Sequence, residues 1–138
     1  MQLFTRNKKT GVQSFILNLL NNSRMKTESM IDGPRLERRV HLTIVVLVIP
    51  LEDKKPRVEK TFATVTKEFS STGVGVVLSE PIGLDQVILG FRNQGEMTFI
   101  RAEARHLTPI GGGFFQLGLQ MIEVVFPGKY PELRSAVL

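Results

Sequence analysis

Two short segments carry the side chains best suited to bind a planar, phosphorylated ligand. In Pro-Arg-Leu-Glu-Arg-Arg-Val, Arg35 and Arg39 lie four residues apart. A guanidinium group donates two parallel hydrogen bonds to a phosphate or to the O6 and N7 edge of guanine. The second segment, Glu68-Phe-Ser-Ser-Thr-Gly73, offers the hydroxyl of Ser70 and, at its glycine, backbone without a side chain. Together the two segments suggest a nucleotide receptor.

Each segment also has an ordinary structural explanation. Arg35 and Arg39 precede a predicted strand, and charged residues there are typical of a solvated edge. Ser70 to Gly73 separates two predicted strands, where a serine-rich hairpin needs glycine for its geometry. In the functional interpretation, Ser70 donates to a phosphate or a base edge, while Gly73 permits a positive φ and a close approach of the backbone.

The composition limits the classes of protein to consider. A chain of 138 residues is long enough for one hydrophobic core, and its formal charge of +5 attracts anions such as phosphates or nucleic acid. Cysteine is absent, and His41 and His106 are the only histidines, so we expect no structural metal site and no cofactor. The sequence contains no nucleophile with a plausible base and no recognisable carboxylate pair, so we do not expect an enzyme.

The first 34 residues are predicted to form a helix and a flexible connection. Apolar residues recur at helical spacing within residues 11–22, and residues 24–34 contain few large apolar groups and a Gly-Pro pair. The apolar run at residues 15–20 is short and is interrupted by Asn18, and no stretch approaches the roughly 20 apolar residues of a membrane span. We therefore expect a cytoplasmic protein without a membrane span.

Residues 35–138 are predicted to form one all-β domain. Turn-forming residues separate six segments rich in Val, Ile, Phe and Thr, with no helix-length segment between them. This pattern favours a six-stranded antiparallel β-barrel. The predicted strands are residues 40–51, 58–69, 74–78, 86–91, 97–106 and 114–125. Residues 130–137 are predicted to form a short C-terminal helix that packs on the barrel through Leu133, Ala136 and Val137.

The two segments, in their order and spacing, resemble the signature of the PilZ domain family. That signature is Arg-x-x-x-Arg followed by Asp or Asn-x-Ser-x-x-Gly, which Arg35, Arg39, Ser70 and Gly73 match. Glu68 departs from it, since it is one methylene longer than the usual Asp. The resemblance extends over residues 35–126 and implies a split-barrel fold and a receptor site for cyclic di-GMP, a bacterial second messenger.

The resemblance also implies roles for individual residues. The two arginines would bind guanine and phosphate, the serine would donate from the turn, the glycine would permit the turn, and the carboxylate would accept from guanine N1 or N2. The residues expected to bind cyclic di-GMP are Arg35, Arg39, Glu68, Ser70 and Gly73, with Arg38 and Arg105 as weaker candidates.

The predicted function is a receptor and adaptor that changes conformation on binding cyclic di-GMP and signals to a protein partner. Residues 24–34 would change position on binding and re-orient the N-terminal helix. One alternative is a degenerate PilZ-like module that binds a protein without the nucleotide. Another is a basic barrel on single-stranded nucleic acid, which is less favoured because the chain has no Trp and one Tyr, and its Phe residues fall mainly in predicted strands.

Overall fold

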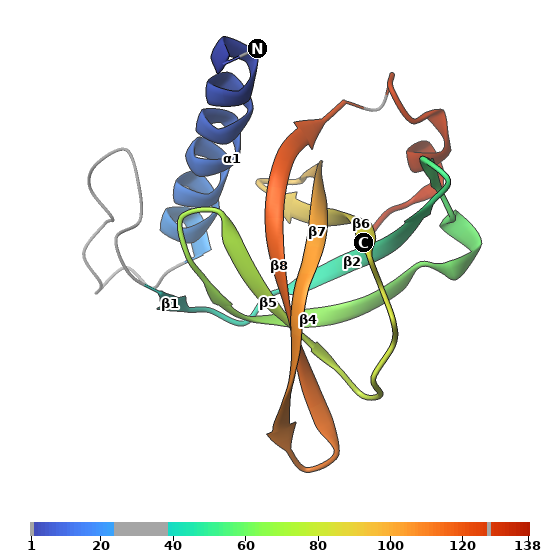
Figure 1. The fold of residues 1–138 in the computed structure, drawn as a ribbon. Helices are drawn as coiled ribbons and strands as arrows, with labels where there is room; N and C mark the ends of the chain where they lie inside the picture. Colours follow the sequence, from blue (N-terminus) through green and yellow to red (C-terminus); the bar gives the residue numbers. More distant parts are fainter. Residues whose placement is uncertain (1, 24–38, 127) are drawn as a thin grey trace.

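The computed structural model of the chain describes residues 2–23, 39–126 and 128–138. The described part begins with one α-helix, continues as eight strands and ends with a short 3-10 helix (Figure 1). The elements are α1 (Gln2–Ser23), β1 (Val40–His41), β2 (Val45–Glu52), β3 (Lys55–Pro56), the 3-10 helix η1 (Val58–Lys60), β4 (Phe62–Phe69), β5 (Gly73–Leu78), β6 (Gln86–Asn93), β7 (Glu96–Gly111), β8 (Phe114–Val125) and the 3-10 helix η2 (Pro131–Ser135).

Six of the strands form a closed antiparallel barrel. Their order is β4, β5, β8, β7, β6 and β2, and β2 pairs with β4 to close the ring. The two-residue strands β1 and β3 pair with β4 and β2, respectively. Short turns join β4 to β5, β6 to β7 and β7 to β8, which suits antiparallel pairing, whereas parallel strands need long crossovers. The predicted six-stranded antiparallel barrel is confirmed.

The first predicted strand, residues 40–51, is interrupted, and a buried threonine explains the interruption. The hydroxyl of Thr66 on β4 donates to the carbonyl oxygen of Leu42 at 2.7 Å and accepts from the backbone N–H of Ile44 at 3.0 Å. A side chain therefore takes the place of a backbone partner, and β4 is irregular between Thr66 and Glu68. The hydrogen bonds of Thr66 fall between β1, which ends at His41, and the barrel strand β2, which begins at Val45.

The β7–β8 hairpin is longer than predicted. The strand predicted to end at His106 continues to Gly111, and its continuation pairs with β8 but not with β6. Pro109 is tolerated there because an edge strand does not need every backbone donor. The hairpin projects beyond the rest of the barrel (orange in Figure 1).

The N-terminal helix packs on the barrel and shares its core. Val12, Ile16, Leu19 and Leu20 are buried in the same hydrophobic cluster as the barrel interior. Fully burying one such side chain stabilises a protein by about 1.5 to 3 kcal/mol, so this face holds α1 firmly. The ring of Phe15 lies 5.7 Å from that of Phe91 on β6, measured between centroids.

The helix starts earlier than the predicted residues 11–22, at Gln2. The spacing of apolar residues reveals only the part of a helix that faces a core. In this helix that part begins at Val12, because residues 5–10 contain no large apolar residue. No helix in the described ranges is long and apolar enough to cross a bilayer.

The C-terminal segment is a 3-10 helix, shorter than the predicted helix over residues 130–137. Leu133 and Ala136 are buried against the outer face of the sheet, three residues apart, which matches the 3-10 repeat. Val137 is 61% exposed, so its predicted packing on the barrel is wrong. A segment this short gains too little from α-helical hydrogen bonds to overcome the cost of nucleation.

Candidate functional site

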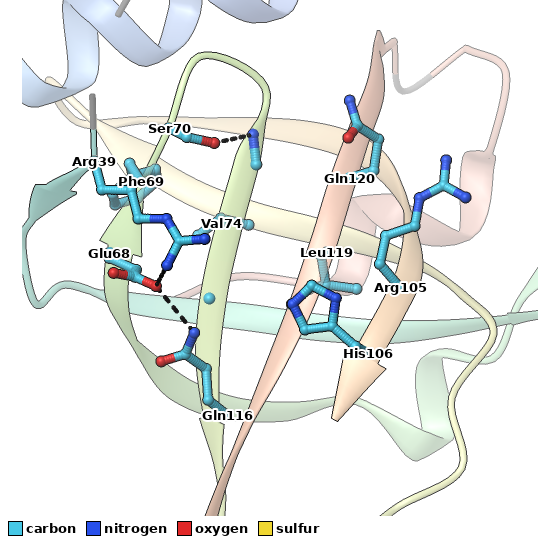
Figure 2. Close-up of a pocket in the computed structure, with 13 residues that line it drawn as sticks. Arg39, Glu68, Phe69, Ser70, Val74, Arg105, His106, Gln116, Leu119 and Gln120 are labelled. Carbon is cyan, nitrogen blue, oxygen red and sulfur yellow. Dashed lines mark hydrogen bonds and ion pairs between the residues drawn. The ribbon is translucent and has the colours of Figure 1, made fainter. Parts of the chain in front are cut away.

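A pocket opens on the outer face of the barrel where β4, β5, β8 and β7 lie side by side (Figure 2). Its volume is about 190 Å³. Glu68 and the turn after β4 line one side, and Arg105 and His106 from β7 line the other. Strands β5 and β8 form the floor, so the barrel itself fixes the distance between the two sides.

One carboxylate oxygen organises the β4 side of the pocket. Oε1 of Glu68 accepts from the guanidinium group of Arg39 at 3.2 Å and from the amide nitrogen of Gln116 at 3.1 Å (Figure 2). The other oxygen, Oε2, lies 4.0 Å from Nδ1 of His41, beyond hydrogen-bond distance. Within the described ranges, Oε2 accepts no hydrogen bond and is free to accept one from a ligand.

The turn between β4 and β5 is closed by its own serine and glycine. The hydroxyl of Ser70 accepts from the backbone N–H of Gly73 at 3.1 Å, and the backbone N–H of Ser70 donates to the carbonyl oxygen of Gly73 at 2.9 Å. The expected positive φ at Gly73 is wrong, because this residue is not among the positive-φ glycines of the described chain. The glycine is required for space instead, since a Cβ there would lie 2.7 Å from the hydroxyl oxygen of Ser70.

The structure brings most of the predicted site residues together. Arg39, Glu68, Ser70, Gly73 and the weaker candidate Arg105 all line this pocket. The side chain of Arg39 is 71% exposed and can turn toward a ligand, while Arg105 lies 3.3 Å from Glu103 on its own strand. The predicted contacts of Arg35 and Arg38, and the predicted movement of residues 24–34, fall outside the described residues.

Of the pocket residues on β7 and β8, only Arg105 was predicted from the sequence, as a weaker candidate. Gln116, Gly118 and Gln120 alternate along β8 toward the pocket, and His106 lies opposite Gly118 on β7. The alternation of β8 was readable in the sequence, but its register with β5 was not. That register places Gly73 opposite Gln120 and Gly75 opposite Gly118.

The pocket is equipped to bind an anion with a polar planar group. Arg39 and Arg105 supply positive charge from opposite sides, Glu68 supplies an acceptor, and amide groups come from Gln116 and Gln120. Such a set recognises phosphates and base edges. In the part of the chain that the structure describes, no group of three or more His, Cys, Asp or Glu side chains is placed to hold a metal ion.

A second charged cluster surrounds Glu123 on β8, whose side chain is 11% exposed. Its Oε2 accepts from Nε of Arg101 at 2.7 Å, and the amino groups of Lys8 on α1 and Lys129 lie 3.4 and 3.7 Å from its oxygens. Burial raises the pKa of Glu123, but the hydrogen bond and charge of Arg101, with the charges of Lys129 and Lys8, outweigh burial and lower the pKa below the ordinary value. This cluster joins the helix, β7 and β8.

The closed six-stranded antiparallel barrel has a PilZ-like fold. The fold of the chain is similar to the solved structure of the Bacillus subtilis inhibitor of motility, MotI/DgrA, with a TM-score of 0.51 and 16% sequence identity. The alignment covers 77% of this chain and 50% of that protein, so this chain matches about half of its length. No model of a known protein family matches the chain, and no curated protein matches it.

Proposed function

We propose that the protein is a non-catalytic receptor for cyclic di-GMP and an adaptor that passes the binding event to a protein partner. The observation that carries the proposal is the convergence of Arg39, Glu68, Ser70 and Gly73 on one pocket. These residues come from segments about thirty positions apart in the chain, and β1–β4 pairing brings the segments together.

The proposed binding mode uses the chemistry of each side chain. Arg39 leaves Oε1 of Glu68 and donates to a phosphate or to the O6 and N7 edge of guanine. Oε2 of Glu68 accepts from guanine N1 or N2, and Ser70 donates from the turn. The present Arg39–Glu68 pair opposes binding only weakly, because Arg39 is 71% exposed and ion pairs open to water typically contribute about 0.2 to 1 kcal/mol.

The adaptor role is supported by strand β8, which serves the pocket and the helix together. Gln116, Gly118 and Gln120 line the pocket, whereas Glu123 further along the strand contacts Lys8 of α1. A ligand that shifts β8 would alter the docking of α1 and so change the surface shown to a partner, provided that it binds one conformation better than the other. Hydrogen–deuterium exchange of α1 amides should change on ligand saturation, and unchanged exchange would contradict this coupling.

Titration calorimetry with cyclic di-GMP tests the receptor function. The wild-type chain should bind at micromolar concentration or tighter. Arg39→Ala should weaken binding by roughly tenfold to a hundredfold, which is the value of one charge-assisted hydrogen bond. The matched control is Arg134→Ala, an exposed arginine in η2 that does not line the pocket. If the wild type shows no binding, or if both variants bind alike, the proposal is wrong.

A second candidate function is a protein-interaction module that does not bind the nucleotide. The observation that favours it is the projecting β7–β8 hairpin, on which Leu107, Ile110 and Phe114 are 39%, 37% and 48% exposed. All three lie on one hairpin, and exposed apolar side chains are frequent in protein-binding surfaces. Absence of cyclic di-GMP binding in the calorimetric titration would favour this function over the first.

A further inference from the structure

Four pocket residues form a continuous row across four neighbouring strands. Glu68 on β4 lies opposite Gly75 on β5, Gly75 lies opposite Gly118 on β8, and Gly118 lies opposite His106 on β7. Directly opposed residues of antiparallel strands share one face of the sheet, and all four line the pocket. The row therefore has polar side chains at its ends and no side chains in the middle. We call Gly75 and Gly118 the glycine floor.

Two planar polar groups cover the glycine floor in this structure. A Cβ built on Gly75 would lie 2.7 Å from the amide nitrogen of Gln116, and one built on Gly118 would lie 2.7 Å from Nε2 of His106. The amide and the imidazole thus occupy the space directly above the glycines. Both are the far ends of flexible side chains, so a ligand can displace them without moving the backbone.

No hydrogen bond within the described ranges holds the imidazole of His106 over Gly118, so this side chain can move and contact a ligand. His106 is exposed and, within the described ranges, makes no hydrogen bond and no ion pair. The covering amide of Gln116, by contrast, is already held by Glu68 at 3.1 Å. His106 is therefore the covering group with unused hydrogen-bonding capacity.

The dimensions and chemistry of the row suit a purine base. Three strand spacings separate its ends, roughly 14 Å at about 4.8 Å per spacing, and the side chains of Glu68 and His106 reach inward from both ends. Guanine carries donors at N1 and N2 on one edge and acceptors at O6 and N7 on another. Oε2 of Glu68 is an acceptor, and the imidazole offers a ring N–H as donor.

We propose that the glycine floor receives one purine base of the ligand and that His106 is a specificity-determining residue that contacts this base from the β7 side. The base lies flat on Gly75 and Gly118, with its donor edge toward Glu68 and its acceptor edge toward His106. A carboxylate at one end favours guanine over adenine, because adenine presents an acceptor at N1. This inference rests on the proposed binding of cyclic di-GMP.

The glycine floor is tested by placing a methyl group on it. Gly118→Ala should weaken cyclic di-GMP binding at least tenfold by calorimetry, while its melting temperature stays within about 3 °C of the wild type. The double variant Gly118→Ala with His106→Ala removes the neighbour that the methyl group displaces, and it should bind at least tenfold more weakly than His106→Ala alone. The matched control is Gly83→Ala, since Gly83 is outside the pocket and has no atom near its Cβ position.

The contact of His106 is tested by affinity and by NMR. His106→Ala should weaken cyclic di-GMP binding roughly threefold to tenfold, the value of one neutral hydrogen bond, and should reduce the preference over cyclic di-AMP. Because the chain has two histidines, imidazole resonances are assigned by single substitution. The resonances of His106 should move on titration with cyclic di-GMP.

The outcomes separate this inference from the function on which it rests. Wild-type affinity in Gly118→Ala and His106→Ala, together with loss of binding in Arg39→Ala, would overturn the inference and leave the receptor function intact. Equal affinity of the double variant and of His106→Ala alone would also overturn the floor, because the effect of Gly118→Ala would then come from the displaced imidazole. A wild-type chain that does not bind cyclic di-GMP would overturn both proposals.

Discussion

Two glutamates on the barrel, Glu68 and Glu123, are each surrounded by positively charged groups, and the surroundings differ in one respect. The carboxylates are similarly covered, with side chains 15% and 11% exposed. Their arginine partners are not, because Arg39 is 71% exposed and Arg101 is 19% exposed. At Glu123 both members of the pair are withdrawn from water, whereas at Glu68 only the carboxylate is.

The difference separates a structural cluster from an adjustable one. Arg101 is largely withdrawn from water and its other carboxylate, Glu103, is 3.7 Å away, so the charge and hydrogen bond of Glu123 at 2.7 Å are its main compensation. Arg39 remains hydrated with or without Glu68, and little free energy is lost when the pair opens. A binding site needs partners of the second kind, since a ligand must compete with them.

The largest expected effect is loss of stability on removing the buried carboxylate. Glu123→Ala removes the hydrogen-bonded carboxylate of Arg101 and leaves it only the more distant and more exposed carboxylate of Glu103, 3.7 Å away, so it should reduce the free energy of unfolding by about 2 kcal/mol. Urea denaturation measures it. The control is Glu52→Ala, whose carboxylate is 45% exposed and also has two cationic partners, Arg57 and Lys60; it should cost less than about 1 kcal/mol. Equal losses in the two variants would remove the distinction between buried and exposed clusters.

A smaller loss of stability is expected when the pH is lowered. The pKa of Glu123 is lowered in the folded protein, so the unfolded chain binds the proton more readily. Its contribution to stability is therefore complete above pH 4.5, the ordinary value, and is lost as the pH falls through the folded pKa. The stability difference between the wild type and Glu123→Gln, measured by urea denaturation, should shrink as the pH is lowered from about 6 to about 3. A difference that is constant with pH would contradict the lowered pKa.

The barrel could be predicted from the sequence because its signals are local. Each strand is a run of β-branched and apolar residues bounded by turn residues, and the predicted bounds of β8 match the structure. The interruption at residues 42–44 could not be predicted. It depends on hydrogen bonds between the side chain of Thr66 and the backbone of Leu42 and Ile44, which lie more than twenty residues earlier in the chain. A side chain that replaces a backbone hydrogen-bond partner does not change the periodic pattern of apolar residues in the sequence.

The pocket also has one side that could be predicted from the sequence and one side that could not. Its β4 side was predicted from two motifs, since Arg39, Glu68, Ser70 and Gly73 lie in short segments with a recognisable spacing. Its β7 and β8 side depends on register, because a shift of one residue would turn His106 to the opposite face. The bulge between Ala104 and His106 sets that register, and no pattern in the sequence marks it.

The smallest expected effect is the coupling between the pocket's own charged pair. A double-mutant cycle with Arg39→Ala and Glu68→Ala should give a coupling free energy for folding of less than about 0.5 kcal/mol, because the pair is open to water at Arg39. The same cycle on Arg101 and Glu123 should give a value several times larger. If the pocket pair were coupled as strongly as the buried pair, Arg39 would be fixed by the fold and could reach a ligand only at a cost comparable to the hydrogen bonds that it gains. A weak coupling leaves the guanidinium group free to exchange Glu68 for a phosphate.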